Sequence, residues 1–165
     1  MTDTTPDIPG VIAPPPLIAA ATVALGLLLD WIFPVYVLSV LLLFWPRLVI
    51  GLLLLAAGAG LAFAGERNFR HAGTNVPPWQ PALKLVDSGI HGYLRNPMYV
   101  GMALMIGGLA IALANDWMLV LLVPAALLIH YGVVLREERY LEAKFGEPYR
   151  RYMHNVPRYG WPDRQ

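Results

Sequence analysis

Four apolar stretches, each close to the length that crosses a lipid bilayer, constrain this chain more than any other feature. A transmembrane helix needs about 20 apolar residues, with a range of about 17–25, and the stretches cover 17–33, 48–65, 97–114 and 117–135. The chain is 57% hydrophobic and 14% charged, against about 45–50% and about 25% in soluble domains. A soluble chain of 165 residues has too small a core to keep so many apolar side chains away from water. We therefore predict an all-α integral membrane protein with about four transmembrane helices.

A fifth apolar segment, 35–44, lies between Pro34 and Pro46. Ten helical residues rise only about 15 Å, which is too short to span a bilayer. This segment is expected to lie at the membrane interface or to extend the first helix at an angle.

The first sixteen residues contain Asp3 and Asp7 but no Lys or Arg. They lack the basic start of a cleaved signal peptide, and we expect residues 1–16 to form a disordered leader. Residues 17–165 are then predicted to form a single membrane domain.

Positive charge is concentrated in two segments. Of the 12 Lys and Arg residues, four lie in 66–96 and seven lie from Arg136 onward. Two predicted spans separate these segments, so both must lie on the same side of the membrane, and the positive-inside rule makes that side cytoplasmic. We predict a protein of a prokaryotic cytoplasmic membrane, with the 66–96 loop and a helical C-terminal tail in the cytoplasm.

The third span begins in a stretch that is rich in polar and aromatic residues. Asn96 suits the N-cap and Pro97 the first turn of a helix, which accounts for two residues without invoking function. His91, Arg95 and Tyr99 nevertheless crowd the same membrane boundary. A helix N-terminus carries partial positive charge and free N–H groups, so together with Arg95 it indicates a receptor for a carboxylate or phosphate.

The fourth span is predicted to continue out of the membrane as a helix that carries Glu137 and Glu138. One interpretation is a solvated face on which these glutamates pair with Arg136 and Arg139. His130 lies seven residues before Glu137, on the same face. An ionisable residue inside a span is a functional candidate, and a hydrogen bond from His130 to a neighbouring helix is the alternative.

Two further features have competing explanations. Met98, Met102 and Met105 share one face of the third span, where they could line a lipid groove or pack against another helix. The aromatic and basic tail over 149–161 could lie on anionic headgroups or fold over a site as a lid. The chain has no cysteine, which excludes thiolate metal sites and a cysteine nucleophile, and neither a metal nor a nucleic-acid partner is expected.

Two separated motifs resemble the isoprenylcysteine carboxyl methyltransferase family, and the related phospholipid N-methyltransferases are similar over the same parts. The resemblance begins at about Thr74 and is carried by Ser88-Gly89, Arg95-Asn96-Pro97-Met98-Tyr99-Val100-Gly101, Glu137-Glu138, Leu141, Phe145-Gly146, Tyr149, Tyr152 and Val156-Pro157-Arg158. This sequence departs from the family pattern at two positions: Asn96 replaces the usual histidine, and His91 stands at an aromatic position.

The resemblance implies S-adenosylmethionine as the methyl donor, bound at the cytoplasmic mouth of a catalytic part over about 74–160. The positions that would contact it are Leu85, Val86, His91, Asn96, Pro97, Met98, Tyr99 and Glu137. The chemistry of this donor adds Arg95 for its carboxylate, Glu137 or Glu138 for its ammonium, and Tyr93, Tyr99 or His91 around the adenine or sulfonium. Arg95 and Glu137 are the predicted catalytic residues, and Met102, His130 and Arg158 are candidates for the acceptor.

The sequence thus predicts a membrane methyltransferase with a lipid-like or small apolar acceptor that enters from the bilayer. O-, N- and S-methylation remain open, as does the oligomeric state. Two alternatives are a membrane reductase that uses a nicotinamide cofactor and a non-enzymatic membrane scaffold.

Overall fold

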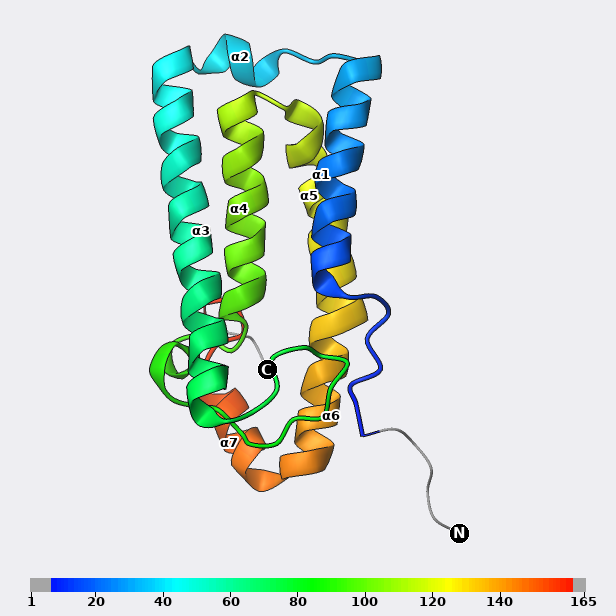
Figure 1. The fold of residues 1–165 in the computed structure, drawn as a ribbon, viewed down its shortest axis with the longest axis vertical. Coiled ribbons are helices and arrows are strands. Elements are labelled where there is room, and N and C mark those ends of the chain that lie inside the picture. Colours follow the sequence, from blue (N-terminus) through cyan, green and yellow to red (C-terminus); the bar gives the residue numbers. More distant parts are fainter. Residues whose placement is uncertain (1–6, 162–165) are drawn as a thin grey trace.

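The computed structural model describes residues 7–161, and within them every regular element is helical. Its long elements form a bundle that runs up and down along one axis (Figure 1): α1 (Pro15–Ile32), α3 (Phe44–Ala72), α4 (Pro97–Leu113) and α5 (Asp116–Ile129). By length and composition, three helices are able to cross a membrane, and α4 is a shorter apolar helix. The all-α prediction is confirmed, although α3 is much longer than the stretch 48–65.

The last span is the longest helix. A π-helical turn, η2 (His130–Val134), joins α5 to α6 (Leu135–Phe145), and the continuous helix Asp116–Phe145 has 30 residues. At 1.5 Å per residue this is about 45 Å, longer than the hydrocarbon core of about 30 Å. The sequence predicted such an extension, and it is α6 that provides it.

The two ends of the bundle differ in character (Figure 1). At one end the short helix α2 (Val37–Leu41) links α1 to α3, and the N–H of Leu38 donates to Asp116 Oδ1 at 3.1 Å. Segment 35–44 thus contains a separate short helix rather than an extension of α1, and its last residue, Phe44, begins α3. At the other end lie residues 73–96, α6, and α7 (Glu147–Asn155). We call this the polar end.

The N-terminal segment contacts the last long helix. Residues 1–6 lie outside the described residues, but residues 7–14 run along α6 and η2, and α1 begins at Pro15. Asp7 pairs with Lys144 at 2.6 Å, and the N–H of Ile12 donates to the carbonyl of Gly132 at 3.1 Å. Residues 7–14 are thus placed against α6 and η2, and Ile12 can lie close to Gly132 because Gly132 has no side chain.

Helices α3 and α4 approach each other closely because glycines line their contact. Gly51, Gly58 and Gly65 are the buried residues of α3, and their spacing of seven places them on one face. A Cβ added to Gly58 would lie 2.5 Å from the carbonyl oxygen of Gly101 on α4. Small residues at such positions let two membrane helices pack backbone against backbone.

We expect Gly58→Val to destabilise the bundle by about 1–3 kcal/mol or more, since the added atoms meet the backbone of α4 and cannot be accommodated by a rotamer change. Gly60→Val is the matched control, because a Cβ at Gly60 meets nothing within 4 Å. Thermal unfolding of both variants in the same lipid nanodiscs measures the difference. Equal midpoints for the two variants would contradict this account of the α3–α4 contact.

Candidate active site

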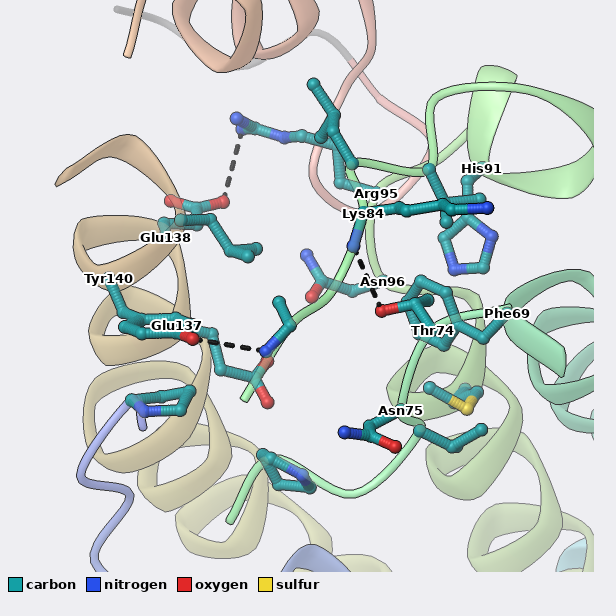
Figure 2. A pocket seen from close by; sticks show the side chains of 18 of the residues that line it. Phe69, Thr74, Asn75, Lys84, His91, Arg95, Asn96, Glu137, Glu138 and Tyr140 are labelled. Atoms are coloured by element: carbon teal, nitrogen blue, oxygen red, sulfur yellow. Dashed lines mark hydrogen bonds and ion pairs between the residues drawn. The ribbon is translucent and has the colours of Figure 1, made fainter. Parts of the chain in front are cut away.

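A pocket at the polar end is built from segments far apart in the sequence (Figure 2). Its volume is about 110 Å³. The end of α3, the 74–86 loop, the 3₁₀ turn η1 (Gly89–Gly92), the start of α4, and α6 and α7 all contribute to its wall. The lining residues include Phe69, Thr74, Asn75, Lys84, Leu85, Val86, His91, Arg95, Asn96, Pro97, Met98, Tyr99, Glu137, Glu138, Tyr140, Leu141, Tyr149 and Tyr152.

The N-terminus of α4 opens onto this pocket. Asn96 stands at the N-cap position, yet its side chain makes no capping hydrogen bond. Its Nδ2 donates instead to the carbonyl oxygen of Arg158 at 3.3 Å. The first N–H groups of α4 are therefore not satisfied by the N-cap side chain, and such groups favour an anionic partner.

Glu137 joins the two sequence motifs directly. The hydroxyl of Tyr99 on α4 donates to Glu137 Oε1 on α6 at 2.7 Å, across a separation of 38 residues. Within residues 7–161 Glu137 forms no ion pair. The interpretation of a solvated, paired face is wrong, because Arg136 and Arg139 bind the carbonyls of Gly10 and Leu135 instead.

The neighbouring Glu138 is engaged quite differently. Both of its oxygens accept from Arg158, at 2.9 Å from Nε and 2.7 Å from Nη2, and Arg95 Nη2 lies 3.4 Å from Oε1. The side chains of Arg95 and Glu138 are 3% and 10% exposed. Figure 2 shows Glu138 reaching from α6 to Arg95, whereas Glu137 lies deeper along the same helix. Glu138 therefore fastens the C-terminal tail to the start of α4.

His91 presents a hydrogen-bond donor in this pocket. Asn68 Nδ2 lies 2.6 Å from the carbonyl oxygen of Ser88 and 3.0 Å from His91 Nδ1. Because an amide nitrogen only donates, Nδ1 accepts and the proton of the neutral ring is assigned to Nε2. Within the described part of the chain, this buried Nε2 has no hydrogen-bond partner. The ring stacks on Phe69 with a centroid separation of 4.3 Å, beside Thr74 in Figure 2.

Burial lowers the pKa of His91 from its ordinary 6.5 to about 4. Between these values the unfolded chain binds a proton that the folded chain does not, so the free energy of unfolding falls as the pH falls. We expect His91 to make its full contribution to the free energy of unfolding above pH 6.5. Below that pH the free energy of unfolding should fall by an amount approaching about 1.4 kcal/mol per pH unit. Unfolding of the wild type and of His91→Gln, followed from about pH 7.5 to about pH 5, measures this. An equal pH dependence in both proteins would contradict it.

Two tyrosines of the tail, Tyr149 and Tyr152, line the pocket. Tyr149, Tyr152 and Val156 form a buried cluster with Leu85 and Phe145, and the hydroxyl of Tyr152 donates to the carbonyl of His91 at 2.7 Å. Burial raises the pKa of Tyr149 and of Tyr152, so both phenols stay protonated. Of the two explanations for the tail, the lid is the one that matches this packing.

Most of the predicted cofactor residues meet in this pocket, and a few do not. Tyr93 is 77% exposed and is not among the lining residues. Arg158 also lies outside the lining and binds Glu138 instead. Met102 and His130 line a second, apolar cavity.

Sequence reasoning did not single out Asn68, Phe69, Thr74 or Tyr140. Asn68 and Phe69 lie near the end of α3. In the sequence alone, a polar residue such as Asn68 at that place is typical of a solvent-exposed helix end. Thr74 Oγ1 accepts from the N–H of Leu83 at 2.9 Å, and Tyr140 accepts from the N–H of Ala82 at 3.1 Å. Local spacing carried no sign of these contacts, since each joins residues that only the fold brings together.

Comparison with known proteins gives one match. The sequence model of a family described as phospholipid methyltransferase matches residues 46–148, which is well over half of the chain. The match begins near the start of α3, well before Thr74, where the resemblance was expected to begin, and it ends before Val156-Pro157-Arg158. Neither the search of curated proteins nor that of solved structures finds a match.

Proposed function

The chain belongs to the phospholipid methyltransferase family, and we propose that it is an integral membrane, S-adenosylmethionine-dependent methyltransferase for a lipid-like or small apolar acceptor. The observation that carries this proposal is the hydrogen bond of 2.7 Å between Tyr99 and Glu137. It brings the α4 motif and the α6 motif to one pocket, where a charged, water-borne donor can meet an acceptor from the membrane.

The residues of the pocket match the functional groups of S-adenosylmethionine. Glu137 supplies a carboxylate for the ammonium group, and it has no cationic partner among residues 7–161. The start of α4 offers N–H groups for the carboxylate. The buried His91 Nε2 offers a donor to an acceptor atom of the ligand. Leu85 and Val86 line the same pocket as apolar walls.

When bound, this cofactor supplies a methyl group that is already activated as a sulfonium. The protein then has to orient the two reactants and keep water away. Tyr99 positions the Glu137 carboxylate through its hydroxyl. Glu138, held by Arg158 and Arg95, fixes the tail over the pocket. We assign Arg95 to positioning, because its guanidinium pairs with Glu138 at the pocket wall.

We further propose that the polar end faces the cytoplasm of a prokaryotic cell. Residues 66–96, which begin in the last turns of α3, and the C-terminal tail lie together at this end (Figure 1), and most of the Lys and Arg residues belong to these two segments. The positive-inside rule assigns such an end to the cytoplasm. Labelling of single cysteines introduced at exposed Tyr93 and exposed Trp45, at opposite ends of the bundle, tests the orientation in sealed vesicles.

Calorimetric titration of the purified protein in nanodiscs with S-adenosylhomocysteine tests the donor. Saturable binding is expected, and competing NADPH should not displace it; displacement would favour a reductase. Limited proteolysis after Gly146 gives a second readout, because a tail that covers the ligand should be protected when the ligand is present. Folded protein that shows no saturable binding would end the methyltransferase proposal.

A further inference from the structure

A second cavity lies in the apolar part of the bundle, beside the donor pocket. Its volume is about 530 Å³, within the range of about 300–1,000 Å³ for small-molecule sites. Helices α1, α3, α4 and α5 line it, and Tyr159 and Trp161 of the tail lie at one end. Tyr99 lines both this cavity and the donor pocket, so its side chain is the wall that the two share.

The end of the cavity near the tail carries a histidine. His130 lies in the π-helical turn η2, an irregularity that often marks functional sites. Its Nδ1 lies 2.8 Å from the hydroxyl of Tyr159, which leaves Nε2 as the ring atom able to meet a ligand. Nε2 donates if Tyr159 donates to Nδ1, and it accepts if Nδ1 carries the proton. A hydroxyl group satisfies either tautomer, because it both donates and accepts.

The rest of the lining limits the charge of the occupant. Among the described residues that line the cavity there is no Asp, Glu, Lys or Arg. An ionised group placed there would lose its hydration without gaining a counter-charge, which is strongly unfavourable. A phosphodiester headgroup does not suit these walls, whereas a hydrocarbon body does.

We propose that this cavity binds the methyl acceptor as an uncharged amphiphile, with its hydrocarbon body among α1, α4 and α5 and a single hydroxyl or phenol at His130. That this amphiphile is the methyl acceptor rests on the proposed function, whereas its binding in the cavity does not. His130 touches the polar head and holds it at the end of the cavity where Tyr99 separates it from the donor. The rim is open to the outside of the bundle, since Leu127 and Trp161 are 52% and 62% exposed.

The test uses three probes that share a twelve-carbon chain: 4-dodecylphenol, dodecyl phosphate and dodecyl methyl ether. A diazirine analogue of 4-dodecylphenol labels the protein in phosphatidylcholine nanodiscs, and mass spectrometry locates the label. Ala103 lines the cavity, so the larger side chain of Ala103→Phe should occupy part of it. Ala57→Phe, on the exposed face of α3, is the matched control. His130→Phe keeps a ring but removes both nitrogens. S-adenosylhomocysteine binding is measured in parallel for each variant.

We expect label on cavity residues, competition by 4-dodecylphenol, and weaker competition by the phosphate and the ether. Ala103→Phe should lose at least about tenfold in specific labelling while Ala57→Phe matches the wild type. His130→Phe should weaken 4-dodecylphenol roughly 3- to 10-fold, as expected for one lost hydrogen bond, and leave the ether unchanged. Equal labelling of the two alanine variants, or equal competition by dodecyl phosphate, would overturn the proposal. If the wild type does not bind S-adenosylhomocysteine, the proposed function is contradicted, whereas the result on binding in the cavity still holds.

Discussion

Replacing Glu137 with glutamine is expected to weaken S-adenosylhomocysteine binding by roughly 10- to 100-fold while leaving the folded state nearly as stable as the wild type. A hydrogen bond to a charged group contributes about 1.5–3 kcal/mol, and each 1.4 kcal/mol is about tenfold in affinity. The glutamine keeps an oxygen that can accept from Tyr99, so the change removes the charge and preserves the contact between α4 and α6.

Calorimetry measures this loss, and Glu142→Gln provides the matched control. Glu142 lies on the same helix and pairs with Arg150 at 3.3 Å on the surface, so its removal should change neither affinity nor stability appreciably. Unchanged affinity in Glu137→Gln would refute the assignment of this carboxylate to the ammonium group. A Glu137→Gln protein that no longer folds would refute the claim that its role is limited to binding.

The adjacent substitution, Glu138→Gln, is expected to act on stability instead. It leaves Arg95 and Arg158 without the carboxylate that faces both of them. Removing one partner of a buried ion pair costs about 3–5 kcal/mol, and we expect the lower end of this range because both arginines make further contacts. At about 2–4 °C per kcal/mol for a chain of this size, the midpoint of thermal unfolding should fall by roughly 10 °C.

The tail gives an independent readout of the same change. Because Arg158 is anchored through Glu138, proteolysis after Gly146 should become faster in Glu138→Gln than in Glu137→Gln. The two variants therefore separate two neighbouring carboxylates of the same type, one assigned to ligand binding and one to the closed tail. Similar cleavage rates and similar midpoints in both variants would contradict this division.

Several features of the site follow from the sequence for simple reasons. A run of apolar residues long enough to cross a bilayer leaves few alternatives to a helix, since only internal hydrogen bonding satisfies the backbone in lipid. The end of the extended helix follows from Gly146, which is a typical stop signal after the charged residues that continue the last span. The meeting of the α4 motif with the α6 motif follows from span parity, because a hairpin of two helices returns the chain to the side on which it started.

Other features depended on contacts that no local pattern encodes. The sequence alone does not distinguish the roles of the adjacent Glu137 and Glu138. In the structure Glu137 accepts a hydrogen bond from Tyr99, and Glu138 pairs with two arginines. No local pattern in residues 7–14 indicates the contact that Ile12 makes with the helix at Gly132. Asn68 orients His91 from another helix across 23 residues.

The sequence by itself determined the helical class of this protein, the approximate positions of its apolar helices, the segregation of its charge and the two motifs that carry the family resemblance. These properties depend on the free energy of transferring short stretches of chain between water and lipid, which residue type and spacing largely fix. Only the tertiary structure decided which carboxylate is paired, where the tail closes and that His130 stands at the end of an apolar cavity. Those outcomes depend on the packing of side chains from different helices, where a shift of one position along a helix turns a side chain by about 100°.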